Sequence, residues 1–270
     1  MTITLTKHHG LGNDFLVCDT TQLSADADWA ELAIGWCDRR RGIGADGLLL
    51  LTVLDTFELS MVLHNADGSR AEMSGNGIRC LVQAAYLAAG HAGEVDYVVH
   101  TDGGVRSVHL DPLDDATVMA SVGMGEVTAM DEPHGWHAIG ADPMRPVLHL
   151  NTGNPHTVVG VEDVLVVDLL GLGRKVPQVN LEIIEPGPEP SAITMRVHER
   201  GAGITEACGT GACVSAWAAV HWGLASPLDG EILVHMDGGD AKVRLHQPEP
   251  GHVTLVGPAV FIARLQIDLP

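Results

Sequence analysis

Short runs of alternating apolar and polar residues dominate the chain, and two longer stretches of small and apolar residues interrupt them. A period of two is typical of strands that bury one face. The two longer stretches, Ile78 to Ala89 and Ala212 to Gly223, are typical of buried helices that end at glycine. The pattern therefore predicts many short strands around one central helix in each half of the chain.

A third helix is predicted at Trp29 to Arg40, where apolar residues have helical spacing and basic residues stand at the end. Strands are expected in the first half at residues 3–5, 14–19, 47–53, 58–64, 97–100, 105–110 and 117–122. The second half repeats this order with strands at residues 147–150, 157–161, 193–199, 231–235, 241–245, 253–256 and 260–267, and with a mixed segment at 164–170. The last strand comes after the second repeat is complete, so we expect it to return to the first domain.

Two glycine loops precede the two buried helices and match each other, Ser74 to Gly77 (Ser-Gly-Asn-Gly) and Cys208 to Gly211 (Cys-Gly-Thr-Gly). Two further pairs of fragments recur in the same order and at similar separations. One is Gly-Asn at residues 12–13 and 153–154, and the other is Asp-Gly-Gly at residues 102–104 and 237–239. We infer a tandem repeat of two similar domains, 1–113 completed by 258–270, and 114–257, with a linker near Asp111 to Asp115.

The composition excludes several classes of protein. With 15 Lys and Arg against 35 Asp and Glu, the net charge of −20 would repel nucleic acid and anionic membranes. No window reaches the roughly 18 uninterrupted apolar residues of a spanning helix, and the N-terminus does not resemble a signal peptide, so we expect a cytoplasmic protein. Five cysteines, an odd number without a Cys-x-x-Cys pair, fit a reducing compartment.

Two candidate cofactor sites fail on their context. Gly42 to Gly47 matches the dinucleotide pattern G-x-G-x-x-G, but basic residues precede it and a strand follows it, where a nucleotide site needs a strand and then a helix. The nearest histidine cluster, His134 and His137, lies in a loop rich in Pro, Gly and Asp and lacks a ligand motif. We therefore expect no metal and no cofactor.

Cys208 is the strongest candidate for chemistry. A thiol at the N-terminus of a helix lies in a positive partial charge, which is expected to lower its pKa and raise its thiolate fraction. Cys80 and Cys213 lie within the helices among apolar residues and are expected to pack in the core. Two helix N-termini could hold one carboxylate group of a substrate between them, each with an acid or base beside it. This arrangement suits a reaction in which a proton is removed from the carbon next to the carboxylate and returned from the opposite face.

Several motifs, in order along nearly the whole chain, carry a family resemblance. They are Gly-Leu-Gly-Asn-Asp-Phe at residues 10–15, Gly-Ile-Gly-Ala-Asp-Gly at 42–47, Asn-Ala-Asp-Gly-Ser at 65–69, Gly-Asn-Gly-Ile-Arg-Cys at 75–80, Gly-Asn-Pro-His at 153–156, Glu-Arg-Gly-Ala-Gly at 199–203 and Ala-Cys-Gly-Thr-Gly at 207–211. Together they resemble diaminopimelate epimerase. The resemblance implies an α/β fold of two similar domains, each a strand barrel around a central helix.

The resemblance also implies a function, the interconversion of LL- and meso-diaminopimelate in lysine and peptidoglycan biosynthesis, without pyridoxal phosphate and with two cysteines as acid and base. By matching motif, Cys208 is one of these cysteines, and His156 and Glu199 are candidates for orienting groups beside the thiols. The reacting carboxylate would be held by Gly75, Asn76, Gly209 and Thr210. The rest of the substrate site would be formed by Asn13, Asn65, Asn154, Asn180, Glu199 and Arg200, with Arg200 pairing with the distal carboxylate. Family members are usually dimers, so the resemblance implies a homodimer.

The chain departs from the family at Ser74, where the second catalytic cysteine is expected. An alcohol is a far weaker acid than a thiol, so Ser74 cannot serve as a base at neutral pH unless another group activates it. Either the serine was introduced in place of a cysteine, or it is natural. In the second case the protein is a slow epimerase helped by His156 or Glu199, or a one-base enzyme.

Two alternatives to an epimerase of diaminopimelate stay open. The first is a related amino-acid racemase or dehydratase with a single catalytic cysteine. The second is a non-catalytic protein that binds amino acids. Cys208 favours an enzyme, since a protein that only binds has no need of a thiolate at a helix N-terminus.

Overall fold

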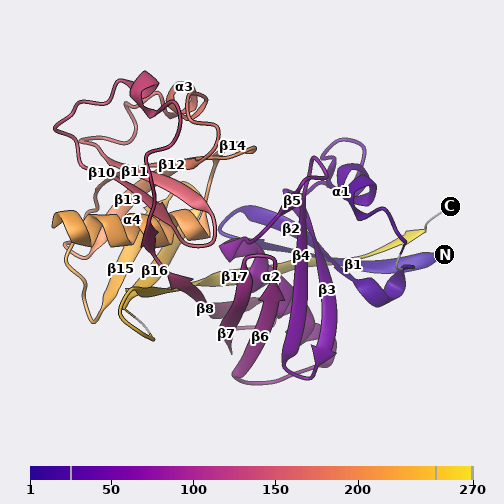
Figure 1. Cartoon of the computed structure of the whole chain (residues 1–270). Coiled ribbons are helices and arrows are strands. Elements are labelled where there is room, and N and C mark those ends of the chain that lie inside the picture. The colour runs from indigo at the N-terminus through magenta and orange to yellow at the C-terminus, as the bar shows by residue number, and fades with distance from the viewer. Residues whose placement is uncertain (25, 247, 269–270) are drawn as a thin grey trace. The chain divides into compact units, whose positions relative to one another are not determined.

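A computed structural model describes residues 1–24, 26–246 and 248–268 (Figure 1). The chain divides into two compact units, unit 1 with Met1–Val122 and the segment from Gly257, and unit 2 with Gly123–Val256. Both units combine many strands with a few helices, which confirms the mixed α/β fold with internal duplication. Residues 269 and 270, which the sequence assigned to the first domain, lie outside the described residues.

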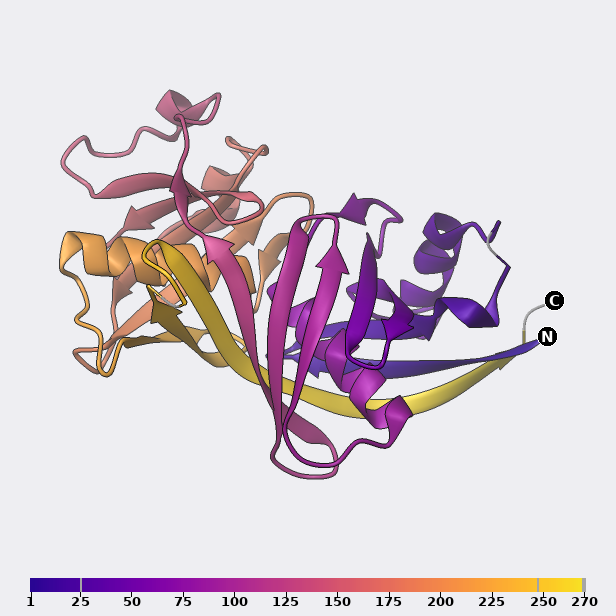
Figure 2. The same cartoon turned by 60° about the horizontal axis from the view of Figure 1, so that its bottom comes forward.

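Unit 1 contains helices α1 (Trp29–Cys37) and α2 (Gly75–Ala89) and a 3-10 turn at Thr20–Gln22. Its strands are β1 (Thr2–Gly10), β2 (Asn13–Asp19), β3 (Gly47–Asp55), β4 (Glu58–Asn65), β5 (Arg70–Ala71), β6 (Val95–Thr101), β7 (Gly104–Pro112) and the first part of β8 (Thr117–Glu126). The second part of β17 (His252–Asp268) belongs to unit 1 and pairs with β1 and β8. Figure 2 shows β17 in yellow alongside the indigo β1. The expected return of the last strand to the first domain is therefore found.

Unit 2 contains α3 (Leu169–Gly173), α4 (Gly209–Trp222) and a 3-10 turn at Trp136–Ile139. Its strands are β9 (Thr128–Ala129), β10 (Val147–Asn151), β11 (Pro155–Gly160), β12 (Asn180–Pro186), β13 (Ala192–Glu199), β14 (Gly203–Thr205), β15 (Glu231–Met236) and β16 (Gly239–Leu245), together with the first part of β17. Strands β8 and β17 each continue from one unit into the other.

The two units repeat one pattern of strand pairing. In unit 1, β2 pairs in parallel with β3 and β4 pairs in parallel with β6, while β1–β2, β3–β4, β4–β5, β6–β7 and β7–β8 are antiparallel. In unit 2, β11–β12 and β13–β15 are the matching parallel pairs, and β10–β11, β12–β13, β13–β14, β15–β16 and β16–β17 are the matching antiparallel pairs. Each unit is thus one copy of the same strand arrangement.

One helix lies among the strands of each unit. Helix α2 contacts β1, β2, β3, β4 and β7, and α4 contacts β10, β11, β12, β13, β15 and β16. Both helices are buried over most of their length, and both end at a glycine with a positive φ, Gly90 (66°) and Gly223 (72°). Glycine adopts this left-handed conformation without the steric cost of a Cβ atom, so it ends a helix efficiently. The central helices are therefore confirmed.

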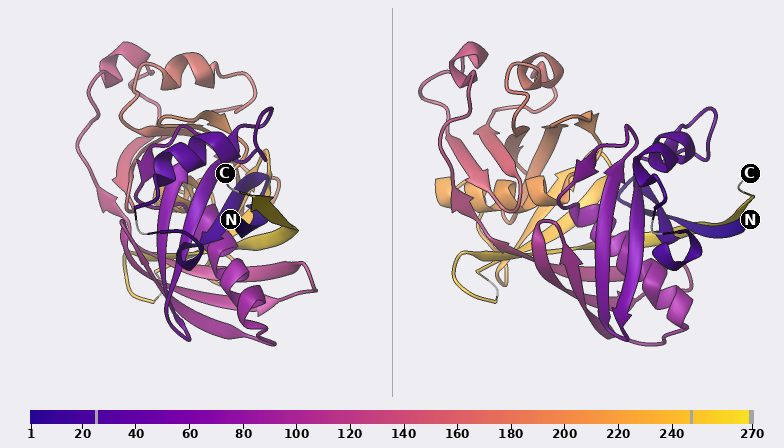
Figure 3. Two further views of the ribbon diagram at one scale, coloured as in Figure 1. Left: turned by 90° about the vertical axis from the view of Figure 1, so that its right-hand side faces the viewer. Right: turned by 45° about the vertical axis from the view of Figure 1, so that its right-hand side comes forward.

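A second layer packs on the outer side of the strands that bear the central helix. In unit 1, α1 packs on β3 and β4 (Figure 3) and joins a core cluster that includes Trp36, Leu48 and Leu50. In unit 2, the segment around α3 forms a matching cluster with Leu181 and Ile183. Strands covered on both faces carry continuous apolar residues in place of alternation. Glu182 in the middle of such a strand is therefore an exception.

Several boundaries differ from the sequence predictions. The residues around Asp111, expected to form the linker, end β7 and turn into β8, and the division lies at Gly123 because β8 continues past it. Helix α1 ends at Cys37, since Asp38 accepts hydrogen bonds from the backbone N–H groups of Arg40 and Arg41. Strand β12 was missed altogether. No helix within the described residues is long and apolar enough to cross a membrane.

Candidate functional site

The thiol of Cys208 caps the N-terminus of α4. Its Sγ accepts a hydrogen bond from the backbone N–H of Gly211 at 3.4 Å and lies 3.5 Å from Oγ1 of Thr210. The cysteine has extended backbone angles (φ −129°, ψ 113°), and the helix starts at the next residue. The glycine loop is thus the first turn of the helix, earlier than the sequence placed it. Cys208 is only 4% exposed.

Glu199, at the end of β13, is hydrogen-bonded to the side chains of Cys208 and Thr205. Burial raises the pKa of Glu199 above its ordinary value, and the nearby charge of Glu182 raises it further. The carboxyl group and the thiol therefore form one hydrogen-bonded pair of weak acids.

The expected lowering of the Cys208 pKa is wrong. Burial raises the pKa of this thiol well above its ordinary value, and the negative charges of Glu199 and Glu182 add to the increase. The hydrogen bonds from Thr210 and Gly211 act in the opposite direction but are outweighed. The helix N-terminus does favour a thiolate, but removal from water and two adjacent carboxyl groups cost more. Cys208 therefore rests as a thiol beside Glu199.

His156 and Glu182 form a second buried pair in the same unit. Nδ1 of His156 lies 2.6 Å from Oε1 of Glu182, and both side chains are fully excluded from solvent. On the other side of the ring, Nε2 lies 2.9 Å from Oδ1 of Asn154. Asn180 lies next to them, with its Nδ2 3.5 Å from Nδ1 of His156 and its Oδ1 accepting the backbone N–H of Arg200 at 2.8 Å.

Glu182 is a site residue that the sequence analysis missed. It lies on the face of β12 that points to α4, because a Cβ atom added to Gly211 would lie 2.8 Å from Oε1 of Glu182 and 3.2 Å from Sγ of Cys208. Its Oε2 has no hydrogen-bond partner among the described residues. The available signal was an acidic residue inside the apolar run Asn-Leu-Glu-Ile-Ile at residues 180–184. A carboxylate in such a strand needs a buried partner.

Ser74 occupies the corresponding place in unit 1. Its Oγ accepts a hydrogen bond from the backbone N–H of Gly77 at 3.0 Å, so the serine caps α2 as Cys208 caps α4. A Cβ atom added to Gly77 would lie 3.3 Å from Oγ of Ser74 and 3.2 Å from Cδ2 of Leu49. The hydroxyl is thus an ordinary N-cap acceptor.

A polar network extends from the α2 loop into unit 1. Nδ2 of Asn76 donates to Oδ1 of Asn13 at 3.1 Å, and Nδ2 of Asn13 donates to Oδ2 of Asp46 at 2.7 Å. Arg79, which is fully buried, donates to Oδ1 of Asn76. Asn65 instead serves its own turn, where its Nδ2 donates to Oγ of Ser69 at 3.0 Å.

The two loops differ in their surroundings as well as in Ser74 and Cys208. Phe15 pairs with the first residue of β3 and His156 with the first residue of β12, so these two residues correspond. Two residues further along β3 and β12, Leu49 corresponds to Glu182. The ionisable pair beside Cys208 is therefore replaced by an apolar pair beside Ser74.

The structure distributes the expected site residues over both units. In unit 2, hydrogen bonds and short contacts connect most of the residues expected there in one group around Glu182: Asn154, His156, Asn180, Glu199, Arg200, Cys208 and Thr210. Gly209 opens α4 beside them, and the side chain of Arg200 is exposed. Unit 1 contains the others, Asn13, Asn65, Ser74, Gly75 and Asn76.

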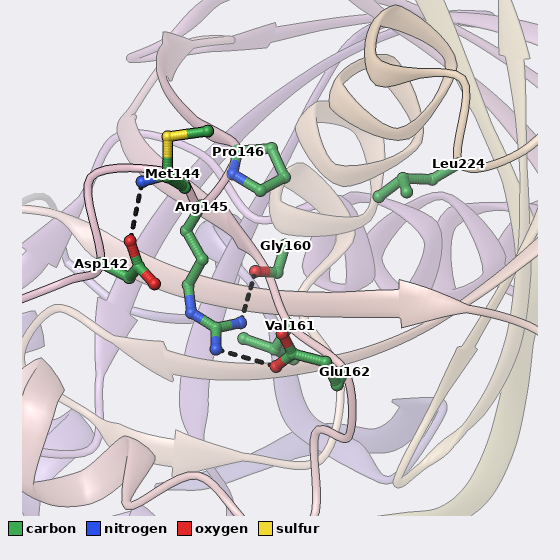
Figure 4. Close-up of a pocket in the computed structure, with 8 residues that line it drawn as sticks. All are labelled: Asp142, Met144, Arg145, Pro146, Gly160, Val161, Glu162 and Leu224. Carbon is green, nitrogen blue, oxygen red and sulfur yellow. Dashed lines mark hydrogen bonds and ion pairs between the residues drawn. The ribbon is translucent and has the colours of Figure 1, made fainter.

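A surface pocket of unit 2 contains none of these residues. It is lined by Asp142, Met144, Arg145, Pro146, Gly160, Val161, Glu162 and Leu224 (Figure 4). Its single cation is already neutralised, because Arg145 pairs with Glu162 at 2.8 Å and donates to the carbonyl of Gly160. Among the described residues, no three His, Cys, Asp or Glu side chains are placed to hold a metal ion.

Comparisons with known proteins identify the family of the chain. The sequence model of the family described as "Diaminopimelate epimerase" matches residues 5–130 and 148–262. The chain belongs to the diaminopimelate epimerase family. A diaminopimelate epimerase of Nostoc punctiforme is 38% identical over 98% of this chain and 100% of its own length. A diaminopimelate epimerase of a Picosynechococcus species is 36% identical over the whole of both chains.

Solved structures support the fold. A "Predicted Epimerase" from Pseudomonas aeruginosa, at 15% sequence identity, superimposes with a TM-score of 0.77 over 99% of this chain and 100% of its own. At this identity the likeness concerns the fold alone. Membership of the diaminopimelate epimerase family confirms the resemblance drawn from the motifs and places the chain among isomerases.

Proposed function

We propose that this chain acts at the α-carbon of diaminopimelate, as an epimerase of LL- and meso-diaminopimelate in lysine biosynthesis, with Cys208 as its catalytic thiol. The observation that carries the proposal is the capping thiol of α4 in hydrogen-bond contact with Glu199. The relatives named diaminopimelate epimerase, which match the chain over its whole length, support the choice of substrate.

The residues of unit 2 supply the chemistry as follows. Glu199 as a carboxylate takes the proton of the Cys208 thiol, and the thiolate then removes the α-hydrogen of the substrate as a proton. The electron pair of the broken C–H bond moves onto the substrate carboxylate. The N–H groups of Gly209 and Thr210 have no partner inside α4, so they are the proposed donors to that carboxylate. Such donors are worth roughly a hundredfold to a thousandfold in rate.

The roles of the other residues follow the family motifs. Gly75 and Asn76 are proposed to hold the same carboxylate from the α2 loop, and His156 to support the chemistry at Cys208. The remaining substrate contacts are assigned to Asn13, Asn65, Asn154, Asn180, Glu199 and Arg200. The bidentate guanidinium of Arg200 suits the distal carboxylate.

Ser74 limits this activity to one face of the α-carbon. Its hydroxyl accepts from Gly77, and Leu49 and Phe15 occupy the places that Glu182 and His156 hold beside Cys208. No group at those two places can remove a proton from Ser74. We therefore propose that Cys208 removes and returns the proton on the same side, so that epimerisation is slow and a cysteine at position 74 restores it.

The test is exchange of the substrate α-hydrogen in heavy water. Incubation of the unmodified chain with LL-diaminopimelate is expected to introduce deuterium at the α-carbon with little meso product, and Cys208→Ala is expected to abolish the exchange. Binding without exchange would instead indicate a protein that only binds amino acids. Exchange with a different amino acid of a panel, and not with diaminopimelate, would indicate a related racemase or dehydratase.

The location and assembly of the protein belong to the same proposal. All five cysteines are buried and none forms a disulfide within the described residues, which supports a reducing compartment such as the cytoplasm. A homodimer is proposed from the resemblance to the family, and the mass of the purified protein by light scattering tests it.

A further inference from the structure

Three side chains of unit 2, Glu182, His156 and Asn154, form a chain of contacts from the first turn of α4 to the start of β11. Oε1 of Glu182 lies 2.6 Å from Nδ1 of His156, and Oδ1 of Asn154 lies 2.9 Å from Nε2. Both ring nitrogens therefore face oxygen atoms. A histidine satisfies two such acceptors when it carries a proton on each nitrogen.

Asn180 is a second neighbour of Nδ1. Its Oδ1 accepts the backbone N–H of Arg200, which directs its NH2 group toward His156. Nδ2 of Asn180 lies 3.5 Å from Nδ1 of His156, whereas Oε1 of Glu182 lies 2.6 Å away and is the closer neighbour. The contact with Glu182 thus favours a proton on Nδ1, and the contact with Oδ1 of Asn154 favours one on Nε2.

The fold does not need this pair. Unit 1 has the same strand pairing with Leu49 and Phe15 at the two positions. A buried ion pair is often no more stabilising than apolar side chains of similar volume. The charged pair is therefore better explained by what it does for its neighbours than by stability.

We propose that Glu182 is a positioning residue that acts through His156 to fix the orientation of the Asn154 amide. Glu182 keeps the ring protonated on both nitrogens, and Nε2–H then donates to Oδ1 of Asn154. The NH2 group of Asn154, which makes no hydrogen bond within the described residues, is left to donate to a carboxylate of the substrate. This inference rests on the proposed function, in which Asn154 contacts the substrate.

The first test is Glu182→Gln, which keeps the shape of the side chain. The glutamine carbonyl accepts from Nδ1–H of a neutral ring, so Nε2 becomes an acceptor and turns the amide of Asn154 to present its oxygen. A lost donor to a carboxylate corresponds to a roughly tenfold to hundredfold increase in KM for α-hydrogen exchange of diaminopimelate. The kcat is expected to change as well, because the charge of Glu182 also raises the pKa of Cys208 and of Glu199. A fall in kcat at unchanged KM would overturn the proposal.

Glu185→Gln is the matched control. Glu185 lies on the same strand, and its Oε2 accepts the backbone N–H of Val164 at 2.7 Å, which a glutamine oxygen also accepts. This variant is expected to keep the KM of the unmodified chain. An equal rise in KM for both variants would show a general effect of substitution in β12 and would contradict a specific role of Glu182.

The second test does not depend on enzymatic activity. Nitrogen NMR of the unmodified chain with labelled histidine, with the signal of His156 identified by its loss in His156→Phe, is expected to show an imidazolium at neutral pH. In Glu182→Gln the same signal should become that of a neutral ring. A neutral His156 in the unmodified chain would overturn the inference. If the chain shows no exchange with diaminopimelate, the proposed function fails, while the state of the ring still decides this inference.

Discussion

Phe15 on β2 and His156 on β11 hold the same place in the two units. Each pairs with the first residue of the neighbouring parallel strand, β3 or β12. The repeated fold therefore carries an apolar ring in one copy and an ionisable ring in the other. Only the copy with the ionisable ring has a thiol at the helix N-terminus. This difference makes the duplicated chain chemically one-sided.

A matched pair of glycine variants measures how tightly the two loops are packed. Gly211→Ala places a Cβ atom 2.8 Å from Oε1 of Glu182, whereas Gly77→Ala has no contact below 3.1 Å. We expect Gly211→Ala to destabilise the protein by about 1–3 kcal/mol, the usual cost of overpacking, and Gly77→Ala by less. Urea unfolding checks both values, and an equal loss in the two variants would contradict the packing around Glu182.

The raised pKa of Cys208 predicts slow alkylation near neutral pH. Burial and the charges of Glu199 and Glu182 favour the thiol, so iodoacetamide should modify Cys208 only as the pH rises above the ordinary cysteine range near 9. Glu199→Gln removes one negative charge and should lower that pKa, so alkylation at a fixed pH becomes faster. The same variant should slow α-hydrogen exchange, because the proton acceptor is lost. Mass spectrometry of the modified peptide identifies Cys208.

Glu162→Gln serves as the control for this experiment, since Glu162 lies on the surface and pairs with Arg145. It is expected to leave both rates unchanged. Faster alkylation together with faster exchange in Glu199→Gln would show that Glu199 is not the acceptor.

Asp14 predicts an acid-dependent contribution to stability in unit 1. Burial acts to raise its pKa, but hydrogen bonds and charges from Arg39 and Lys7 outweigh it and leave the pKa below the ordinary value. A carboxyl group with a depressed pKa in the folded state stabilises the protein above its unfolded pKa of about 3.9, and this contribution disappears as the pH falls further. Asp14→Asn should therefore lower the free energy of unfolding at pH 7 and reduce its loss between pH 5 and pH 3. Denaturation at several pH values measures both, and an unchanged slope would argue against this assignment.

The sequence was sufficient for the parts of the fold that depend on local pattern. The two central helices, the repeat and the strand after Gly42 to Gly47 follow from apolar runs and glycine punctuation, and all are present. The helix starts were placed too late, because a glycine loop and a first helical turn contain the same residues when the preceding side chain caps the helix. Cys80 and Cys213 are fully buried, as core packing requires.

The sequence was insufficient where the result depends on what surrounds a residue. The pKa of Cys208 was predicted with the wrong sign, because the helix N-terminus is visible in the sequence but the depth of burial and the two carboxyl groups are not. Strand β12 was missed, since Glu182 interrupts its apolar run and its partner His156 is far away in sequence. Both errors arise from the same buried group.

A cysteine introduced at Ser121, a serine of β8, is the control for the effect of a cysteine introduced at Ser74. Ser121→Cys adds a thiol to β8 in unit 1, and not at the N-cap of α2, so it should not change turnover. An increase in this variant would show that any added thiol is sufficient.

The most direct test of the central claim compares the initial rate of conversion of LL- to meso-diaminopimelate by the unmodified chain and by Ser74→Cys. The one-sided arrangement predicts little conversion by the unmodified chain and a large increase, by orders of magnitude, in Ser74→Cys, since a thiol is a far stronger acid than an alcohol and can supply the second proton-transfer group. Equal turnover of the two proteins would contradict it.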